Sequence, residues 1–245
     1  MQKNVTIFKN IRETETPFYR SIDAILLRIK EGKSMDLVKS IRSEKDKSER
    51  NELKKLLPAI CFSGEFTKRA DKSIINHSGF ICLDFDNYEK VKEMQDDKLR
   101  LSKDKYVYSV FVSPSGKGLK AIVKIPADID NHVNYFISLE EYFDSPYFDK
   151  TSKNIGRVCY ESWDKNIYIN RESEVWDKIK EREYKEVDTS STYKSLPITD
   201  ETKIIEILMK WWEKKYPMSE GQRNQNAYIL AMAFNDYGIP KTTSS

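Results

Sequence analysis

Two aspartates separated by a single residue interrupt an apolar run, Ile81-Cys82-Leu83-Asp84-Phe85-Asp86-Asn87. Residues i and i+2 of a β-strand point to the same face, so such a strand places the two carboxylates side by side. Two ionised carboxylates at that spacing repel each other unless a divalent cation bridges them. The pattern therefore predicts half of a metal site. The alternative is a strand end, at which both acids are solvated and Asp86-Asn87 begins a turn.

The length and charge of the chain limit the function classes it fits. Its 245 residues suffice for one large domain with a small appendage, and 39% hydrophobic residues support a packed core. The formal net charge is only +3, from 42 basic and 39 acidic side chains. This balance excludes a histone-like polycation, but it is compatible with a local basic groove that binds nucleic acid.

The three cysteines, Cys61, Cys82 and Cys159, are dispersed and form no CxxC or Cys/His cluster. This arrangement argues against structural zinc or a disulfide framework and predicts reduced, buried thiols. The sequence contains no apolar stretch of membrane-spanning length and no signal-peptide core near its start. We therefore expect a soluble, cytoplasmic protein that does not interact with a membrane.

Hydrophobic periodicity predicts a mixed series of strands and helices over the first 186 residues, and so an α+β or α/β fold. Strands are expected at residues 5–8, 57–64, 79–85, 106–112, 119–125, 157–160 and 168–170. Helices are expected at residues 17–32, 42–55, 88–101, 132–142 and 172–186, with Leu53, Leu56 and Leu57 on the inner side of the second. A polar segment, residues 187–198, reads as a linker. Residues 199–245 carry the pattern of a separate helical unit, incomplete at its end.

The loop Ser113-Pro114-Ser115-Gly116-Lys117-Gly118-Leu119-Lys120 joins two of the expected strands. Gly116 and Gly118 allow backbone N–H groups to approach a ligand, and Ser115, Lys117 and Lys120 add a hydroxyl and two ammonium groups. These features suit a phosphate, although the spacing is not that of a Walker A motif. An ordinary hairpin turn with solvated lysines remains the alternative.

A metal site for a triphosphate needs a third acid. Asp149 is the best candidate because it follows Tyr147-Phe148 and shortly precedes Arg157; Asp144 and Asp164 compete, and Asp164 is expected in a turn. Arg157 could contact a phosphate or form a structural ion pair with Asp149. Neither of the two histidines has a partner at metal-ligand spacing, and His132 is expected to be a surface residue.

In this order, the motifs resemble the archaeo-eukaryotic primase superfamily of primase-polymerases. Leu83-Asp84-Phe85-Asp86 resembles the family's Asp-x-Asp strand, Ser115 to Leu119 its second motif, and Asp149 its third acid. Lys120 stands where most members have histidine. This departure resembles a branch related to VirE-type N-terminal domains of phages and mobile elements, as do the segments 157–162 and 164–170. The tail, with Glu220-Gly221-Gln222-Arg223-Asn224, resembles the helical domain that follows such primases.

The resemblance implies a catalytic domain with an RRM-like mixed or antiparallel sheet flanked by helices, followed by a small all-α domain. It implies a DNA primase-polymerase in which Asp84, Asp86 and Asp149 hold two Mg²⁺ or Mn²⁺ ions. Ser115, Gly116, Lys117, Gly118, Lys120 and Arg157 would then bind the nucleotide. Its partners would be nucleoside triphosphates, a single-stranded DNA template and, in the same or another chain, a helicase.

Two other functions remain open. The lysine at position 120 leaves room for a non-catalytic module that only binds single-stranded nucleic acid. A metal-dependent nuclease would share the acids, but the sequence shows no evident lysine-carboxylate cleavage motif. In the tail, Gln222, Arg223 and Asn224 would contact the template or the initiating nucleotide, whereas the alternative is that they only cap the following helix.

Overall fold

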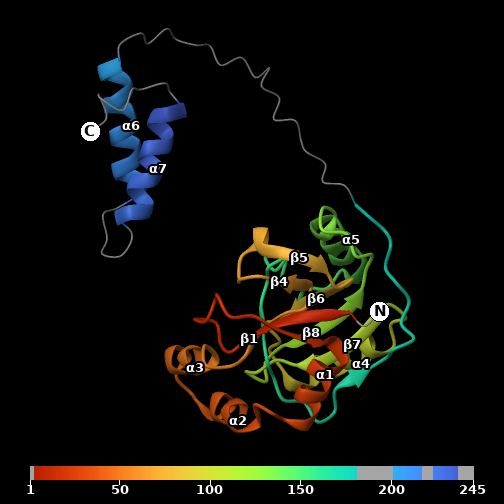
Figure 1. Cartoon of the computed structure of the whole chain (residues 1–245). Helices are drawn as coiled ribbons and strands as arrows, with labels where there is room; N and C mark the ends of the chain where they lie inside the picture. The colour runs from red at the N-terminus through yellow and green to blue at the C-terminus, as the bar shows by residue number, and fades with distance from the viewer. Residues whose placement is uncertain (1–2, 181–200, 217–222, 237–245) are drawn as a thin grey trace. The chain divides into compact units, whose positions relative to one another are not determined.

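The computed structural model describes residues 3–180, 201–216 and 223–236. The chain divides into two compact units, residues 1–182 and 183–245 (Figure 1). The first unit contains two four-stranded antiparallel sheets, a two-stranded hairpin and five α-helices. The expected α+β class with antiparallel sheets is therefore confirmed.

The first sheet has the order β2-β1-β3-β9. Its strands are β1 (Asn4–Phe8), β2 (Phe18–Ser21), β3 (Ala59–Cys61) and β9 (Cys159–Tyr160). The hairpin consists of β4 (Gly64–Phe66) and β5 (Ile74–His77), with a short 3-10 helix, Asp71–Ser73, between them. This hairpin is tied to the first sheet through the buried hydroxyl of Thr6, which donates to the Gly64 carbonyl and accepts from the Phe66 N–H.

The second sheet has the order β10-β7-β8-β6 and carries the aspartate pair. Its strands are β6 (Phe80–Phe85), β7 (Val107–Val112), β8 (Leu119–Lys124) and β10 (Tyr168–Ile169). The expected hairpin is present, because β7 and β8 pair antiparallel across the Ser-Gly-Lys-Gly loop. Strand β8 also pairs with β6 over its whole length, in a register that sets Asp84 opposite Lys120.

The helices cover both sides of this arrangement. They are α1 (Ile22–Glu31), α2 (Met35–Ser43), α3 (Lys47–Lys54), α4 (Val91–Ser102) and α5 (His132–Phe143). One face of the second sheet forms a core with α4 and α5, and the other face packs against the first sheet and α1. Figure 1 shows α2 and α3 together at one edge of this unit, away from α4 and α5. Successive side chains of β6 and β8 point to opposite faces of the second sheet, so each strand contributes apolar side chains to both of these cores.

Three sequence-based expectations about elements are wrong. Residues 18–21 form β2 against β1, and the helix begins only after Ser21, whose side chain accepts from the Ala24 N–H. Residues 42–55 are not one helix, because α2 ends at Ser43 and Asp46 caps a separate α3. Leu56 is 52% exposed rather than on the inner side.

The described part of the expected helix 172–186 is not helical either. Over residues 172–180 the chain is extended or turning, and the Trp176 N–H donates to the Lys124 carbonyl, 2.8 Å away. Trp176 is buried in the core beneath α5. This backbone hydrogen bond to β8 and the burial of the Trp176 indole outweigh the helical preference of the surrounding Glu and Lys residues.

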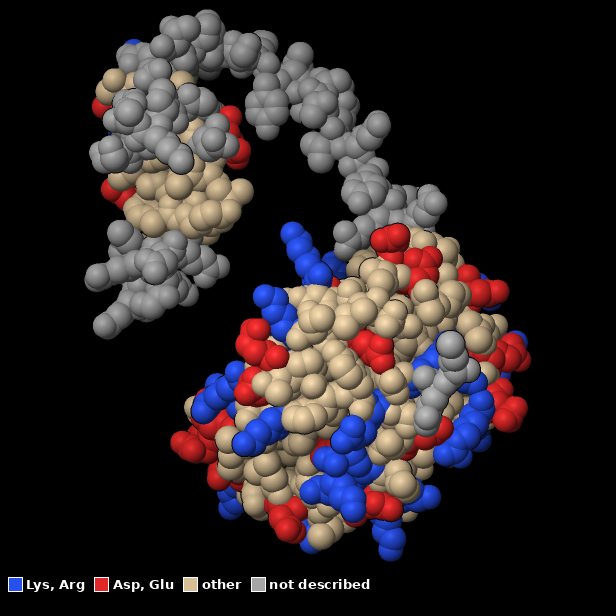
Figure 2. Space-filling model, in the orientation of Figure 1, with Lys and Arg blue, Asp and Glu red and all other residues tan. Residues whose placement is uncertain are grey.

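In the second unit, α6 (Glu201–Lys215) and α7 (Arg223–Asp236) pack through Leu208 and Phe234. The expected linker at 187–198 lies outside the described residues, as do residues 199–200, 217–222 and 237–245 of the tail. Among the described helices, none combines the length and apolar character needed to cross a bilayer. Figure 2 shows charges of both signs interspersed over the visible face of the larger unit, in agreement with the near-neutral total.

Candidate active site: three carboxylates in a basic cleft

Asp84 is fixed by its position inside the second sheet. It precedes the last residue of β6 and is 6% exposed. The antiparallel register sets it opposite Lys120 on β8, and the two side chains form a buried ion pair. Lys120 projects to the face that also carries Cys82 and Ile122, as strand alternation predicted.

Asp86 lies immediately beyond β6, and its N–H donates to the Tyr147 carbonyl at 2.8 Å. The next residue, Asn87, has φ +67°, an uncommon conformation that asparagine tolerates better than most residues. Gly118 makes room for the Asp86 side chain, because a Cβ there would lie 2.2 Å from Asp86 Oδ1 and 2.8 Å from the Phe85 carbonyl oxygen. Gly118, the second glycine of the hairpin loop, is therefore needed because a larger residue would leave no space for the Asp86 side chain.

Asp149 is brought to the pair by a short antiparallel bridge between Phe85 and Phe148. Its N–H donates to the Asp84 carbonyl at 2.8 Å. The Phe148 ring packs edge-on against Phe85, with ring centroids 5.3 Å apart, and also against Phe136 of α5. The aromatic residue before the acid thus sets the acid's position.

One carboxylate oxygen from each of Asp84, Asp86 and Asp149 lies within 4.8 Å of the other two. The two competing acids lie elsewhere. Asp144 ends α5 in a left-handed conformation, and Asp164 accepts from Lys98 Nζ at 2.6 Å and from the Val112 N–H at 2.9 Å. Asp164 also accepts from the Asn166 N–H two residues on, which is the expected turn.

Two further side chains hold the carboxylates together. The Ser152 hydroxyl, which is buried, lies 2.6 Å from Asp149 Oδ2 and 3.2 Å from Asp84 Oδ2. The Arg157 guanidinium is 3.5 Å from Asp149 and 4.0 Å from Asp84. Sequence reasoning proposed the Arg157–Asp149 pair but missed Ser152, because an isolated serine in a turn carries no distinguishing pattern.

The acids differ in how easily they ionise. Burial raises the pKa of Asp86, and the neighbouring charges of Asp84 and Asp149 add to this effect despite Lys120. Burial also acts on Asp149, but hydrogen bonds from Ser152 and Thr151 outweigh it and lower its pKa. For Lys120, burial opposes the charged form, yet the charge of Asp84 dominates and the pKa is raised. A bound cation would therefore favour the ionised form of Asp86 and offset the effect of its burial.

The hairpin loop is held as a rigid turn beside the acids. The Gly116 N–H donates to the Ser113 carbonyl at 2.9 Å, with Gly116 at φ +72°, so this N–H is engaged within the turn. Arg42 of α2 donates to the Ser113 carbonyl and, at 2.9 Å, to the Trp163 carbonyl. Ser113 and Ser115 share a hydroxyl contact of 3.1 Å. The side chain of Lys117 is exposed.

Two adjoining cavities open onto the acids. The smaller, of about 390 Å³, is lined by Asp84, Asp86, Ser115, Lys120 and Arg157, among others. The larger, of about 740 Å³, is lined by Asp86, Asp149, Lys117 and one face of α3. Lys54, Asp86 and Ser115 line both cavities. The structure thus brings together every predicted catalytic residue and the side chains of Ser115, Lys117, Lys120 and Arg157.

Helix α3 was not predicted to belong to the site. Lys47, Arg50, Asn51 and Lys54 all line the larger cavity, and burial and the charge of Arg50 lower the pKa of Lys54. These four residues follow the i, i+3, i+4, i+7 spacing of one helix face. A polar stripe of this kind is visible in the sequence, but only the fold shows that it faces the aspartates.

The donor set suits a hard divalent cation. It consists of three carboxylates, one of them buried, and contains no thiolate or imidazole. Oxygen-only ligands favour Mg²⁺ or Mn²⁺ over zinc or copper. The three residues therefore fit the ions that the sequence suggested.

For two further predictions the outcome differs. Gln222 is outside the described residues; Arg223 and Asn224 begin α7, but their side chains are also outside them, so their role stays a prediction. His132 is not a surface residue: it is buried, and its Nδ1 lies 3.0 Å from Nε2 of His77. Burial lowers the pKa of His77 to about 4 and that of His132 to about 3.

Residues 52–169 match the family model described as the BT4734-like N-terminal domain. None of the curated proteins is significantly similar to the chain. Among solved structures, the chain is similar to the AEP domain of the primase-polymerase of cyanophage S-2L, with 12% sequence identity and a TM-score of 0.38. That similarity covers 71% of this chain and 83% of the phage domain. The range matched by the family model contains the three aspartates, the hairpin loop and Arg157.

Proposed function

We propose that this protein is a template-directed nucleotidyltransferase of the DNA primase-polymerase type. The observation that carries the proposal is the meeting of Asp84, Asp86 and Asp149 in a cleft whose other walls are basic. Acids alone would suit any cation, and basic side chains alone would suit any anion. Together they suit a triphosphate that arrives with its metal ions.

In this proposal, Asp84, Asp86 and Asp149 hold Mg²⁺ or Mn²⁺. When bound, the ions supply stabilisation of the charge on the attacking 3′-oxygen and on the pyrophosphate leaving group. Ser152 keeps the carboxylates of Asp84 and Asp149 close together through its hydroxyl. The aromatic contact between Phe85 and Phe148 fixes the segment that carries Asp149.

The nucleotide would lie against the smaller cavity, with its phosphates near Lys120, Arg157 and the Ser115 hydroxyl. Arg157, which is 44% exposed, has the freedom to pair with a phosphate. Lys120 is held by its ion pair to Asp84 and would act as a fixed positive charge at the floor of the site. Lys117 and the backbone around Gly116 and Gly118 would form the rim.

The partners implied are nucleoside triphosphates, a single-stranded DNA template and a helicase in this or another chain. The VirE-type branch of mobile elements is part of the same proposal. The helical tail, including Gln222, Arg223 and Asn224, would contact the template or the first nucleotide. Removal of residues 199–245 should then abolish primer synthesis and spare extension of a supplied primer; unchanged synthesis would contradict that role.

A module that binds single-stranded nucleic acid without catalysis is the second candidate. The ion pair between Lys120 and Asp84 favours it, because a lysine already neutralises one of the presumed metal ligands. This candidate predicts nucleic-acid affinity that depends on Lys117, Lys120 and Arg157. It also predicts no metal binding by the aspartates.

The direct test is extension of a labelled primer on a single-stranded template with Mn²⁺ and nucleoside triphosphates. We expect products from the wild-type chain and none from the Asp84→Ala/Asp86→Ala variant. Asp96→Ala is the matched control, because Asp96 is an exposed acid on α4 and lies outside both cavities. Equal blank lanes for the wild type and both variants would contradict polymerase activity.

A further inference from the structure

Helix α3 carries a row of cations to which the proposed metal and nucleotide sites assign no role. Lys47, Arg50 and Lys54, called here the α3 basic face, line the larger cavity together with Asn51. With a rise of 1.5 Å per residue, the row extends for about 10 Å along the helix axis. Its inner member, Lys54, also lines the smaller cavity beside Asp84 and Asp86.

In the described part of the chain, the three cations of the α3 basic face form no ion pairs. Within the described ranges 3–180, 201–216 and 223–236, neither Lys47 nor Lys54 has an ion-pair partner, and Arg50 donates only to a carbonyl, that of Glu44. Lys54 is only partly exposed. Three like charges on one helix face repel one another, at a cost that an anion between them would remove.

The walls of the same cavity suit a polynucleotide better than a small anion. Lys117 stands on the hairpin loop and adds a further cation. Tyr88 and Tyr147 also line the cavity, and their rings stack on each other with centroids 4.1 Å apart. Cations that follow a backbone, combined with aromatic rings on which bases stack, are typical of single-strand binding grooves.

We infer that the larger cavity is a single-strand channel in which the α3 basic face binds successive phosphates and leads the strand to the aspartates. The inference deepens the proposed function and rests on it. Phosphates on an extended single strand lie farther apart than the roughly 3.4 Å axial rise of a duplex strand, so a row of about 10 Å spans about two of them. The strand enters beside Lys47 and passes Lys54 to reach the acids.

The test is binding of a fluorescent single-stranded oligonucleotide, measured by anisotropy at several salt concentrations. The variant is Lys47→Ala/Arg50→Ala, which alters the outer end of the row and leaves Lys54 in place. We expect weaker binding by several-fold and a salt slope reduced by about 1.4, because each lost phosphate contact on a single strand removes roughly 0.7 from the slope. Binding of Mn²⁺ with a nucleoside triphosphate should stay unchanged.

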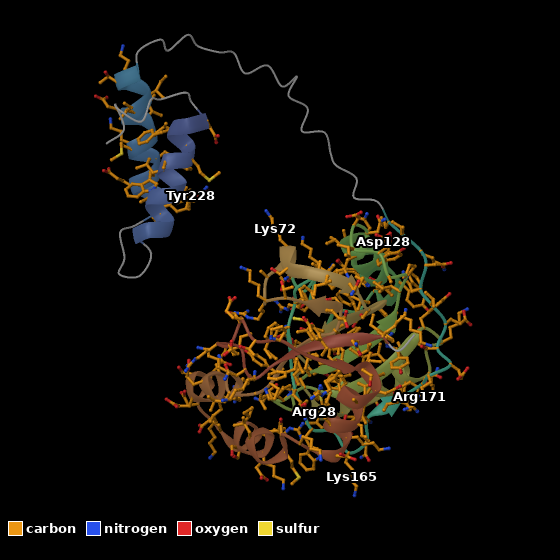
Figure 3. All side chains as sticks on the ribbon, viewed as in Figure 1. Arg28, Lys72, Asp128, Lys165, Arg171 and Tyr228 are labelled. Atoms are coloured by element: carbon orange, nitrogen blue, oxygen red, sulfur yellow. The ribbon has the colours of Figure 1, made fainter. Side chains whose placement is uncertain are left out.

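Two controls separate charge from position. Lys72→Ala/Lys165→Ala removes the same net charge at two exposed lysines outside both cavities (Figure 3) and should bind as the wild type does. Lys47→Arg/Arg50→Lys keeps the charge on α3 and should also bind normally. Circular dichroism of each variant checks that the fold is unchanged.

The outcomes distinguish this inference from the proposed function. An unchanged salt slope in Lys47→Ala/Arg50→Ala would overturn the inference while leaving a metal-binding catalytic site intact. Weaker nucleotide binding with unchanged oligonucleotide binding would also overturn it, because the row would then serve the triphosphate. Loss of oligonucleotide binding in a chain whose aspartates bind no Mn²⁺ would support the channel and contradict catalysis.

Discussion

Lys120 of β8 lies directly opposite Asp84 of β6, and the two side chains form a buried ion pair at the floor of the aspartate cluster. The side chains of Lys120 and Asp84 are 13% and 9% exposed. The pair couples the sheet register to the charge of the site, because a one-residue slip of β8 would move the ammonium to the other face. Lys120 is thus a structural part of the aspartate cluster, because the pairing of β6 and β8 fixes its ion pair with Asp84.

Substitution of Lys120 by alanine should destabilise the fold. Among the described residues, Asp84 would then keep Arg157, 4.0 Å away, as its one ion-pair partner, and an uncompensated buried charge costs about 3 kcal/mol or more. We expect a loss of that size in the free energy of unfolding by urea at neutral pH, measured with a chelator present. The double variant Asp84→Asn/Lys120→Ala should recover part of it. Equal stability of the wild type and the single variant would contradict the pairing.

Substitution of Gly118 by alanine should disturb Asp86 and the neighbouring Phe85 carbonyl directly. The new methyl group would lie 2.2 Å from Asp86 Oδ1, so the carboxylate must move, at a cost of about 1–3 kcal/mol. Mn²⁺ affinity should fall along with stability. Gly116→Ala is the matched control: its φ of +72° costs about 1 kcal/mol for alanine, but its nearest neighbour, Arg42, is 3.5 Å away. Equal Mn²⁺ affinities in both variants would contradict the role assigned to Gly118.

The pair formed by half-buried His77 and buried His132 should make the fold sensitive to acid. The His77 Nδ1 accepts from the Gly79 N–H at 2.9 Å, so its Nε2 carries the proton and donates to His132. Burial lowers the pKa of both rings, to about 4 and about 3, from an ordinary value of 6.5. Between pH 6.5 and about 4 the unfolded chain therefore binds more protons than the folded one. Stability is full above pH 6.5 and falls as the pH drops.

A lowered pKa of this size corresponds to on the order of 3 kcal/mol for one ring. Urea unfolding at pH 7 and pH 4.5 measures the loss. His132→Asn keeps an acceptor for His77 and removes one titrating group, so its loss over the same interval should be clearly smaller. A loss equal to that of the wild type would show that other groups, such as carboxylates, account for the acid sensitivity.

The local features of the fold could be predicted from the sequence. An apolar run marks β6, and the two glycines between apolar runs mark the β7–β8 hairpin. The i, i+2 spacing of Asp84 and Asp86 predicted carboxylates on one side, and the aromatic pair before Asp149 predicted its approach to them. These features could be predicted because each depends on a few neighbouring residues.

Features that depend on distant contacts could not be predicted. Nothing near His132 indicates that His77, 55 positions earlier, will cover it. Trp176 overrides a helical composition because its indole fills a gap under α5, which exists only once the sheet has formed. Lys54 and Ser152 join the site in the same way, from segments with no motif of their own.

Asp84, Asp86 and Asp149 are expected to form a divalent metal site. The most direct measurement is titration of the protein with Mn²⁺, with the free ion followed by its electron paramagnetic resonance signal. We expect the wild type and Asp96→Asn to bind Mn²⁺. Asp86→Asn and Asp149→Asn should each lose most of that binding while remaining folded. Wild-type protein that binds no Mn²⁺, with or without a nucleoside triphosphate, would contradict a divalent metal site at these three aspartates.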